Sequence, residues 1–137
     1  MSLNFENKTL TIDKEILKTS ESCIREEADI SKINNCIFLL NNASDSISTL
    51  AKILNLTGNE TRLKILYLIY KEKNICVCDL SDVLNISVSA ISQQLKKLKE
   101  GGLIVDNKIG KTNYYLINEE RLESLLAIFI QISKNKI

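Results

Sequence analysis

Two cysteines separated by a single residue, Cys76 and Cys78, are the residues of this chain best suited to chemistry. A spacing of two places both side chains on one side of an extended segment, or of a segment that only begins to be helical. A helix N-terminus also favours the thiolate, which is the form that binds metal. Soft sulfur selects soft ions such as Cd(II), Pb(II), Hg(II), As(III) and Sb(III). The pair therefore predicts a site for a thiophilic ion, although both thiols could instead pack beneath a short helix, or act as a redox sensor.

The chain has two further cysteines and no histidine. Cys23 lies in the polar stretch SESCIREEAD and is expected to be exposed. Cys36 shares an apolar helical face with Ile33, Ile37 and Leu40, which predicts a small buried side chain. Catalysis by a Ser–His or Cys–His pair is impossible without histidine, and no Cys-x-x-Cys pair is present. The sequence therefore predicts no enzyme and no organic cofactor.

Composition limits the class of protein. The 137 residues fit one domain of ordinary size, and 45% are apolar, so a core can form. No run of about eighteen apolar residues is present, so we expect no membrane-spanning helix and no membrane partner. The start, MSLNFENKTL, lacks the basic and apolar segments of a secretory signal. With four cysteines, this predicts a cytoplasmic protein whose cysteines are free thiols or metal ligands and not disulfides.

Periodicity predicts a mostly α-helical chain with a small β-hairpin. Apolar residues recur at helical spacing over residues 46–56, after Asn59 as a helix cap, and over residues 78–84. A fourth helix, residues 88–100, is expected to begin at Ser87 and to end at Gly101-Gly102. The residues predicted to form its buried stripe are Val88, Ile91, Leu95 and Leu98.

Two strands, residues 103–107 and 112–117, are predicted around a turn at Gly110, and a last helix follows Asn118. Two short helices with a tight turn, followed by a hairpin, form a helix-turn-helix with a wing. The last helix carries an apolar face broader than a small monomer can cover, which favours burial against a second copy of the chain over packing in its own core.

The outer face of the fourth helix is polar, and positive charge gathers near it. Five lysines lie between Lys96 and Lys111, against two acidic residues, although the whole chain has a net charge of only +1. Such a face is either an ordinary solvated surface or a DNA-binding surface, in which serine and glutamine bind base edges and lysine binds phosphates. The residues predicted to contact DNA are Ser87, Ser89, Ser92, Gln93, Gln94, Lys96, Lys97, Lys108, Lys111 and Thr112.

The segments ILNLTGNETRLKILYLIY, NICVCDLSDVLNISVSAISQQLKKLKEGGLI and GKTNYYLI together resemble the ArsR/SmtB family of winged-helix metal-sensing repressors. The resemblance implies a homodimer on double-stranded operator DNA, with residues 88–100 in the major groove and residues 108–112 as the wing. It also implies a winged helix-turn-helix domain over residues 46–132, preceded by an N-terminal arm or helical extension over residues 1–45. The residues implied at the dimer interface are Leu50, Leu54, Leu122, Leu125, Leu126 and Phe129.

By the same resemblance, CVCDL matches the metal box of the arsenic, cadmium and lead sensors, where cysteines of an N-terminal arm complete the site. The implied metal ligands are Cys76, Cys78 and Cys23. Three sulfurs suit As(III) or Pb(II), whereas Cd(II) would require Cys36 or another donor as a fourth ligand. Gln94 stands where the family often has histidine, and the lack of histidine argues against the family's other, zinc-type site. The predicted function is a transcriptional repressor that such an ion releases from its operator; the alternative is a similar regulator that responds to thiol redox state or reactive sulfur.

Overall fold

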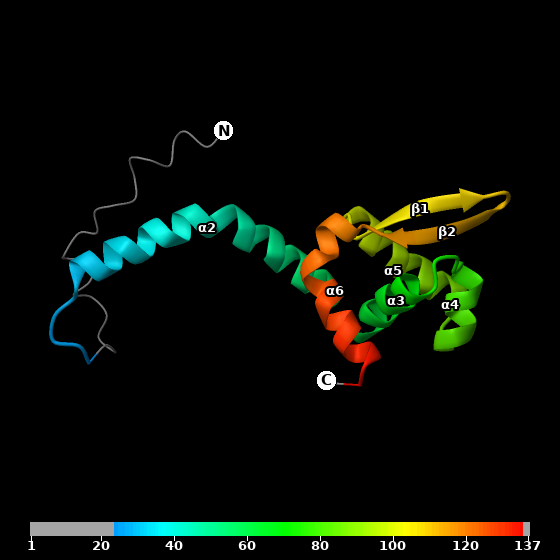
Figure 1. Ribbon diagram of the computed structural model, residues 1–137, viewed down its shortest axis with the longest axis horizontal. Coiled ribbons are helices and arrows are strands. Elements are labelled where there is room, and N and C mark those ends of the chain that lie inside the picture. Colours follow the sequence, from blue (N-terminus) through cyan, green and yellow to red (C-terminus); the bar gives the residue numbers. More distant parts are fainter. Residues whose placement is uncertain (1–23, 136–137) are drawn as a thin grey trace. The chain divides into compact units, whose positions relative to one another are not determined.

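A computed structural model describes residues 24–135, which form helices and one two-stranded antiparallel hairpin (Figure 1). Within these residues, no helix is long and apolar enough to cross a membrane. The predicted fold class, mostly helical with a small hairpin, is confirmed. The elements are α2 (Ile30–Thr57), α3 (Glu60–Lys71), α4 (Val77–Leu84), α5 (Val88–Glu100), β1 (Ile104–Ile109), β2 (Thr112–Ile117) and α6 (Glu119–Ser133).

Helix α2 is longer than expected. Periodicity predicted a helix over residues 46–56 and a separate helical face over residues 33–40, but a single helix begins at Ile30 and continues through the domain boundary predicted at residue 45. The chain divides into two compact units between Thr49 and Leu50, so the end of α2 belongs to the second unit.

The second unit has an aliphatic core built from every helix and from the start of β1. At the centre of this core, Leu80 of α4 and Ile91 of α5 are fully buried. Leu122, Leu125 and Phe129 of α6 are buried in the same core, where Phe129 contacts the rings of Tyr67 and Tyr70. The three α6 residues thus stabilise their own chain, because side chains this deeply buried leave little or no surface for a partner.

Local capping sets the ends of the helices as predicted. Asn59 caps α3, where its side chain accepts a hydrogen bond from the backbone N–H of Arg62 at 3.0 Å. Ser87 caps α5 by accepting one from the N–H of Ala90 at 3.2 Å. Asn85 takes the left-handed conformation (φ 53°) between α4 and α5, which closes the tight turn of a helix-turn-helix.

One residue of the predicted stripe on α5 is not buried. Ile91, Leu95 and Leu98 lie in the core, but the side chain of Val88 is 47% exposed. Val88 is the first residue of α5, where the helix emerges from the turn. The prediction was wrong for Val88 because helical spacing alone does not show how far the neighbouring helices reach.

The hairpin is a regular ladder in which Ile104 pairs with Ile117 at the base and Ile109 pairs with Thr112 at the tip. Gly110 has φ 63°, which fits the turn predicted there. At the base, the ammonium group of Lys99 on α5 pairs with the carboxylate of Asp106 on β1. This contact, together with a hydrogen bond from Asn113, lowers the pKa of Asp106. The hairpin is thereby joined to α5 by an ion pair as well as by the chain.

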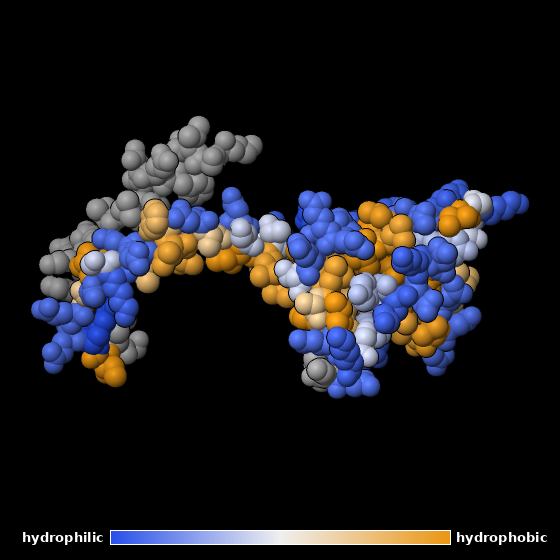
Figure 2. Space-filling view, viewed as in Figure 1, coloured by the Kyte–Doolittle hydropathy of each residue, from blue (hydrophilic) through white to orange (hydrophobic). Residues whose placement is uncertain are grey.

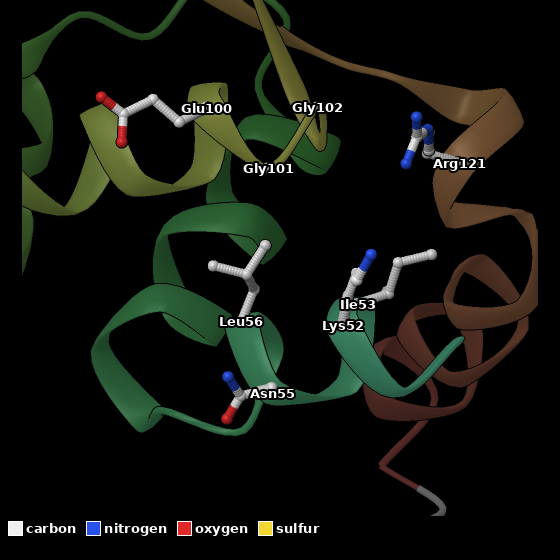
Figure 3. Close-up of a pocket in the computed structure, with 8 residues that line it drawn as sticks. All are labelled: Lys52, Ile53, Asn55, Leu56, Glu100, Gly101, Gly102 and Arg121. Atoms are coloured by element: carbon white, nitrogen blue, oxygen red, sulfur yellow. The ribbon is translucent and has the colours of Figure 1, made fainter. Parts of the chain in front are cut away.

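The turn from α5 to β1 borders a pocket of about 420 Å³, between the end of α2 and α6 (Figure 3). A Cβ atom on Gly101 would lie 2.1 Å from Cδ1 of Leu56, so glycine lets α2 approach the turn closely. Gly102 has φ +75°, a conformation that residues with a Cβ rarely adopt, and the guanidinium of Arg121 lies nearby.

We expect Gly102→Ala to lower the free energy of unfolding by about 1–2 kcal/mol, the usual penalty for a left-handed residue with a Cβ. The nearest side-chain atoms would be 3.8 Å from the new Cβ, so no clash adds to this backbone penalty. Urea unfolding of the full chain measures the effect. Glu100→Ala, at an exposed residue two positions earlier, is the control and should change stability by less than about 0.5 kcal/mol.

Candidate functional site

The two neighbouring cysteines lie where an extended segment becomes a helix. Cys76 is the N-cap of α4, with extended backbone angles (φ −106°, ψ 174°), and the helix begins at Val77. The side chain of Cys76 is half-buried, and that of Cys78, in the first turn, is exposed. Both thiols are free. A segment that only begins to be helical is the geometry that two thiols at this spacing need in order to approach one ion.

Asp79 is a neighbour of the thiols that was not predicted from the sequence. Its carboxylate oxygen Oδ2 accepts hydrogen bonds from the backbone N–H and from the Sγ–H of Cys76, each at 3.1 Å. The backbone bond, and next the thiol bond, lower the pKa of Asp79. Stability from these bonds is therefore present above the ordinary aspartate pKa and is lost as the pH falls through the lowered value. The spacing of Cys76 and Asp79 is that of a capping box, a signal that could have revealed this contact.

The thiol segment is also joined to the hairpin. Cys76 forms an isolated antiparallel bridge with Tyr114 of β2, and Tyr114 pairs with Asn107 of β1. The backbone at Cys76 therefore lies beside the two-stranded sheet as well as at the start of α4. A change of conformation at Cys76 would act on both elements.

A third ligand is not found among the described residues. Within residues 24–135, no three His, Cys, Asp or Glu side chains lie close enough together to hold a metal ion. Cys23, predicted as the third sulfur, lies outside these residues. Cys36 is exposed on α2, which contradicts the prediction that it is buried.

The polar face of α5 has the predicted exposure, with one exception. Exposed residues on or next to α5 are Ser87, Ser89, Ser92, Gln93, Lys96 and Lys97. Lys96 lies 3.9 Å from the carboxylate of Glu100, but an exposed pair of this kind is worth little and leaves the ammonium group available. In the hairpin, Lys108, Lys111 and Thr112 are exposed around its tip.

Gln94 is the exception, because its side chain is engaged within the protein. The guanidinium group of Arg62 on α3 donates from Nη1 to Oε1 of Gln94 at 3.1 Å. The same group donates from Nε to the carbonyl oxygen of Leu56 at the end of α2. Arg62 thus joins three helices, and it holds Gln94 on the inner side of α5. No local sequence pattern predicts the contact between Arg62 and Gln94, because the two residues are 32 positions apart.

We expect Arg62→Ala to misplace α5 and to weaken DNA binding by roughly 2–10-fold, the usual range for loss of one or two hydrogen bonds. Arg62→Lys is the informative companion, because it keeps the charge but cannot make both bonds in the same geometry. Fluorescence anisotropy on one operator fragment measures both variants. Full affinity in Arg62→Lys would mean that charge, and not the two-bond geometry, is what matters.

The residues implied at a dimer interface fall into two groups. Leu122, Leu125 and Phe129 lie in the core of their own chain, and a contact of theirs with a second copy stays a prediction. Leu50 and Leu54 are 44% and 49% exposed, and Leu126 is half-buried. Ile128 and Ile130 of α6 are exposed as well, and Figure 2 shows apolar residues on the surface of α6.

Comparison with known proteins agrees with this arrangement. A family profile described as "Bacterial regulatory protein, arsR family" matches residues 59–105, from the cap of α3 into β1. The cadmium resistance transcriptional regulatory protein CadC of Listeria innocua is 32% identical over 114 residues, which cover 82% of this chain and 90% of CadC. The chain belongs to the ArsR family.

Solved structures agree with the ArsR fold. Reduced HlyU from Vibrio cholerae superposes with a TM-score of 0.62 at 26% identity, covering 68% of this chain and 97% of HlyU. The winged helix-turn-helix domain of Mb0332 from Mycobacterium bovis, described as homodimeric, superposes with a TM-score of 0.56 at 24% identity, covering 69% of this chain and 85% of that one. As an ArsR-family member with this fold, the chain is a DNA-binding transcriptional regulator and not an enzyme.

Proposed function

We propose that the chain is a homodimeric cytoplasmic repressor, which a soft thiophilic ion releases from its operator by binding Cys76 and Cys78 together with Cys23. The observation that carries the proposal is the position of Cys76, at the start of α4 and paired with the hairpin at Tyr114. An ion that moved Cys76 would disturb two elements at once. One is α4, which packs on α5, and the other is the hairpin, which pairs with Cys76 at Tyr114.

The donors present fit a soft ion. Cys76 and Cys78 are free, and cysteine sulfur prefers Cd(II), Pb(II) and As(III) over hard cations. The similarity to CadC, a cadmium resistance regulator that matches most of the chain, supports this class of inducer. Two sulfurs form an incomplete site, so Cys23 is proposed as the third ligand. It would come from the proposed N-terminal arm, residues 1–45, which precedes the proposed winged domain, residues 46–132.

Binding of an ion would alter the cap of α4. Cys76 must lose its thiol proton to bind metal, so its Sγ–H can no longer donate to Asp79. Loss of this hydrogen bond changes the cap of α4, so the first turn of the helix is expected to rearrange. Leu80, one turn later, is fully buried in the core with Ile91 of α5, and a tilt of α4 is therefore transmitted to α5. A typical coupling of about 1–3 kcal/mol lowers operator affinity ~5–150-fold.

The operator surface is proposed as the exposed face of α5 in the major groove, with the hairpin tip on the neighbouring backbone. Two such helices in a dimer must match half-sites roughly 34 Å apart, so a small tilt in each chain spoils both contacts together. For the dimer interface we propose Leu50, Leu54 and Leu126, and we add Ile128 and Ile130 because of their exposure. The homodimeric state of the similar Mb0332 domain supports this arrangement.

The direct test measures release of operator DNA from the full chain, with As(III), Sb(III), Cd(II), Pb(II), Hg(II) and Zn(II) added separately. Soft ions should release DNA at lower concentration than Zn(II), because thiolates bind the softer ions more tightly. A parallel measurement with hydrogen peroxide in place of the ions tests the redox alternative. That alternative is supported by the free thiols and by the similarity to reduced HlyU. Release by peroxide with no response to any ion would contradict the metal proposal and favour the redox one.

A further inference from the structure

The hairpin packs on the core of the second unit through its base. Ile104 is 1% exposed, and both its ladder partner Ile117 and the nearby Tyr115 pack against the core. Side chains alternate between the two faces of a strand, so Asp106 lies on the same face as Ile104, one step closer to the tip. Figure 1 shows the hairpin extending away from the helices toward that tip. The apolar base therefore leaves the outer part of the hairpin to be held by other contacts.

Asp106 joins α5 to both strands at the point where the apolar packing ends. Its carboxylate oxygen Oδ2 pairs with the ammonium group of Lys99, near the end of α5. The other oxygen, Oδ1, accepts a hydrogen bond from Nδ2 of Asn113 on β2 at 3.2 Å. The same Nδ2 also donates to the hydroxyl group of Tyr115 at 3.4 Å. An isolated exposed ion pair contributes little, but this carboxylate belongs to a network that restrains three elements.

The lysines at the hairpin tip lie just beyond this network. Lys108 follows Asp106 by two residues, Lys111 precedes Asn113 by two, and both lysines are exposed. A two-stranded hairpin is only marginally stable by itself and twists readily, so its contacts with α5 set its angle. A change of that angle moves both ammonium groups relative to α5.

The negative charge of Asp106 is unexpected on this surface. Five lysines lie between Lys96 and Lys111, and the DNA backbone repels carboxylates. If Asp106 acted through its charge alone, its removal would strengthen DNA binding. Its contacts with Lys99 and Asn113 predict the opposite effect, because they join the hairpin to α5.

We propose that Asp106 is a positioning residue for DNA binding, which holds the hairpin at the angle to α5 that lets the tip lysines reach the DNA backbone. This role rests on the proposed function, in which the exposed face of α5 and the hairpin tip contact the operator together. Asp106 itself does not touch the DNA.

The first experiment compares Asp106→Asn with Glu100→Gln in the full chain. Both remove one negative charge at nearly constant shape, but Glu100 pairs only with Lys96 of its own helix, at 3.9 Å. We expect Asp106→Asn to lower operator affinity ~3–10-fold at low salt, and to reduce the slope of log K against log salt by about 1–2, because tip contacts with phosphates are lost. Glu100→Gln should keep the parental affinity or raise it slightly. Parental or higher affinity in Asp106→Asn would overturn the proposal.

The second experiment places Asp106→Asn in a chain that already carries Lys108→Ala and Lys111→Ala. Without the tip lysines there is no tip contact left to misplace, so Asp106→Asn should now lower operator affinity less than ~2-fold. A general loss of stability would instead weaken binding equally in both chains. An equal loss in both chains would mean that Asp106 does not act through the tip, and would refute the proposal.

The Lys108→Ala, Lys111→Ala chain also separates the role of Asp106 from the proposed function. If this chain binds operator as tightly as the parent, the hairpin tip does not contact DNA, and the proposed operator surface fails together with the role of Asp106. If it binds more weakly while Asp106→Asn binds like the parent, the operator surface stands and only the role of Asp106 is refuted.

Discussion

Replacement of both Cys76 and Cys78 by serine is expected to abolish release of the operator by soft ions and to leave operator affinity nearly unchanged. Serine is among the best N-cap residues, so α4 keeps its cap and the first turn still forms. The hydroxyl does not bind soft ions as thiolate does, so the coupling of about 1–3 kcal/mol, and with it a ~5–150-fold release, is lost. Anisotropy titrations of one labelled operator, with and without Cd(II) or As(III), measure both quantities.

Cys36→Ser is the matched control for this experiment, because it makes the same chemical change at an exposed thiol on α2. It should respond to As(III) and Pb(II) like the parent chain. Loss of the Cd(II) response alone would identify Cys36 as a fourth sulfur for that ion. Release of the Cys76→Ser, Cys78→Ser chain at parental ion concentrations would refute the assignment of the site.

Lys97→Ala is expected to lower operator affinity by roughly 10-fold at low salt and to reduce the salt dependence of binding. Lys97 is exposed on the polar face of α5, where an ammonium group can meet a phosphate. Loss of one such contact reduces the slope of log K against log salt by about 1, because one fewer counterion is released. The measurement is operator affinity at several salt concentrations, alongside the affinity for Cd(II), which should stay unchanged.

Lys64→Ala serves as its control, since it removes an exposed lysine from α3 that pairs with Glu60 at 2.8 Å. It lowers the net charge by the same amount and should leave the salt slope unaltered. If the two variants had the same slope of log K against log salt, the proposal that α5 contacts the DNA would be wrong.

Features governed by a few adjacent residues were predictable from the sequence. Ser87 as the cap of α5, Gly101 at its end and Gly110 in the hairpin turn all act on their own backbone, so local pattern identified them. The position of Cys76 and Cys78 at a helix start followed from similar local signals. Three of the four residues predicted to form the α5 stripe are buried.

Features that depend on packing were not predictable. The stretch from Asn41 to Asp45 is rich in residues that favour turns over helix interiors, which hid the continuity of α2. The apolar face of α6 showed that it would be buried, but not that Leu122 and Phe129 would be buried in their own chain. The contact of Arg62 with Gln94 required knowledge of how α3 lies against α5.

The exposed valine at the entrance of α5 has a consequence for the base sequence of the operator. Val88 presents an isopropyl group beside Ser87 and Ser89, on the element proposed to enter the major groove. The apolar feature of that groove is the C5 methyl group of thymine, and other base edges there would leave the valine against polar atoms. We therefore expect a thymine at this step of each half-site, and exchange of that thymine for uracil, which removes only the methyl group, should weaken binding.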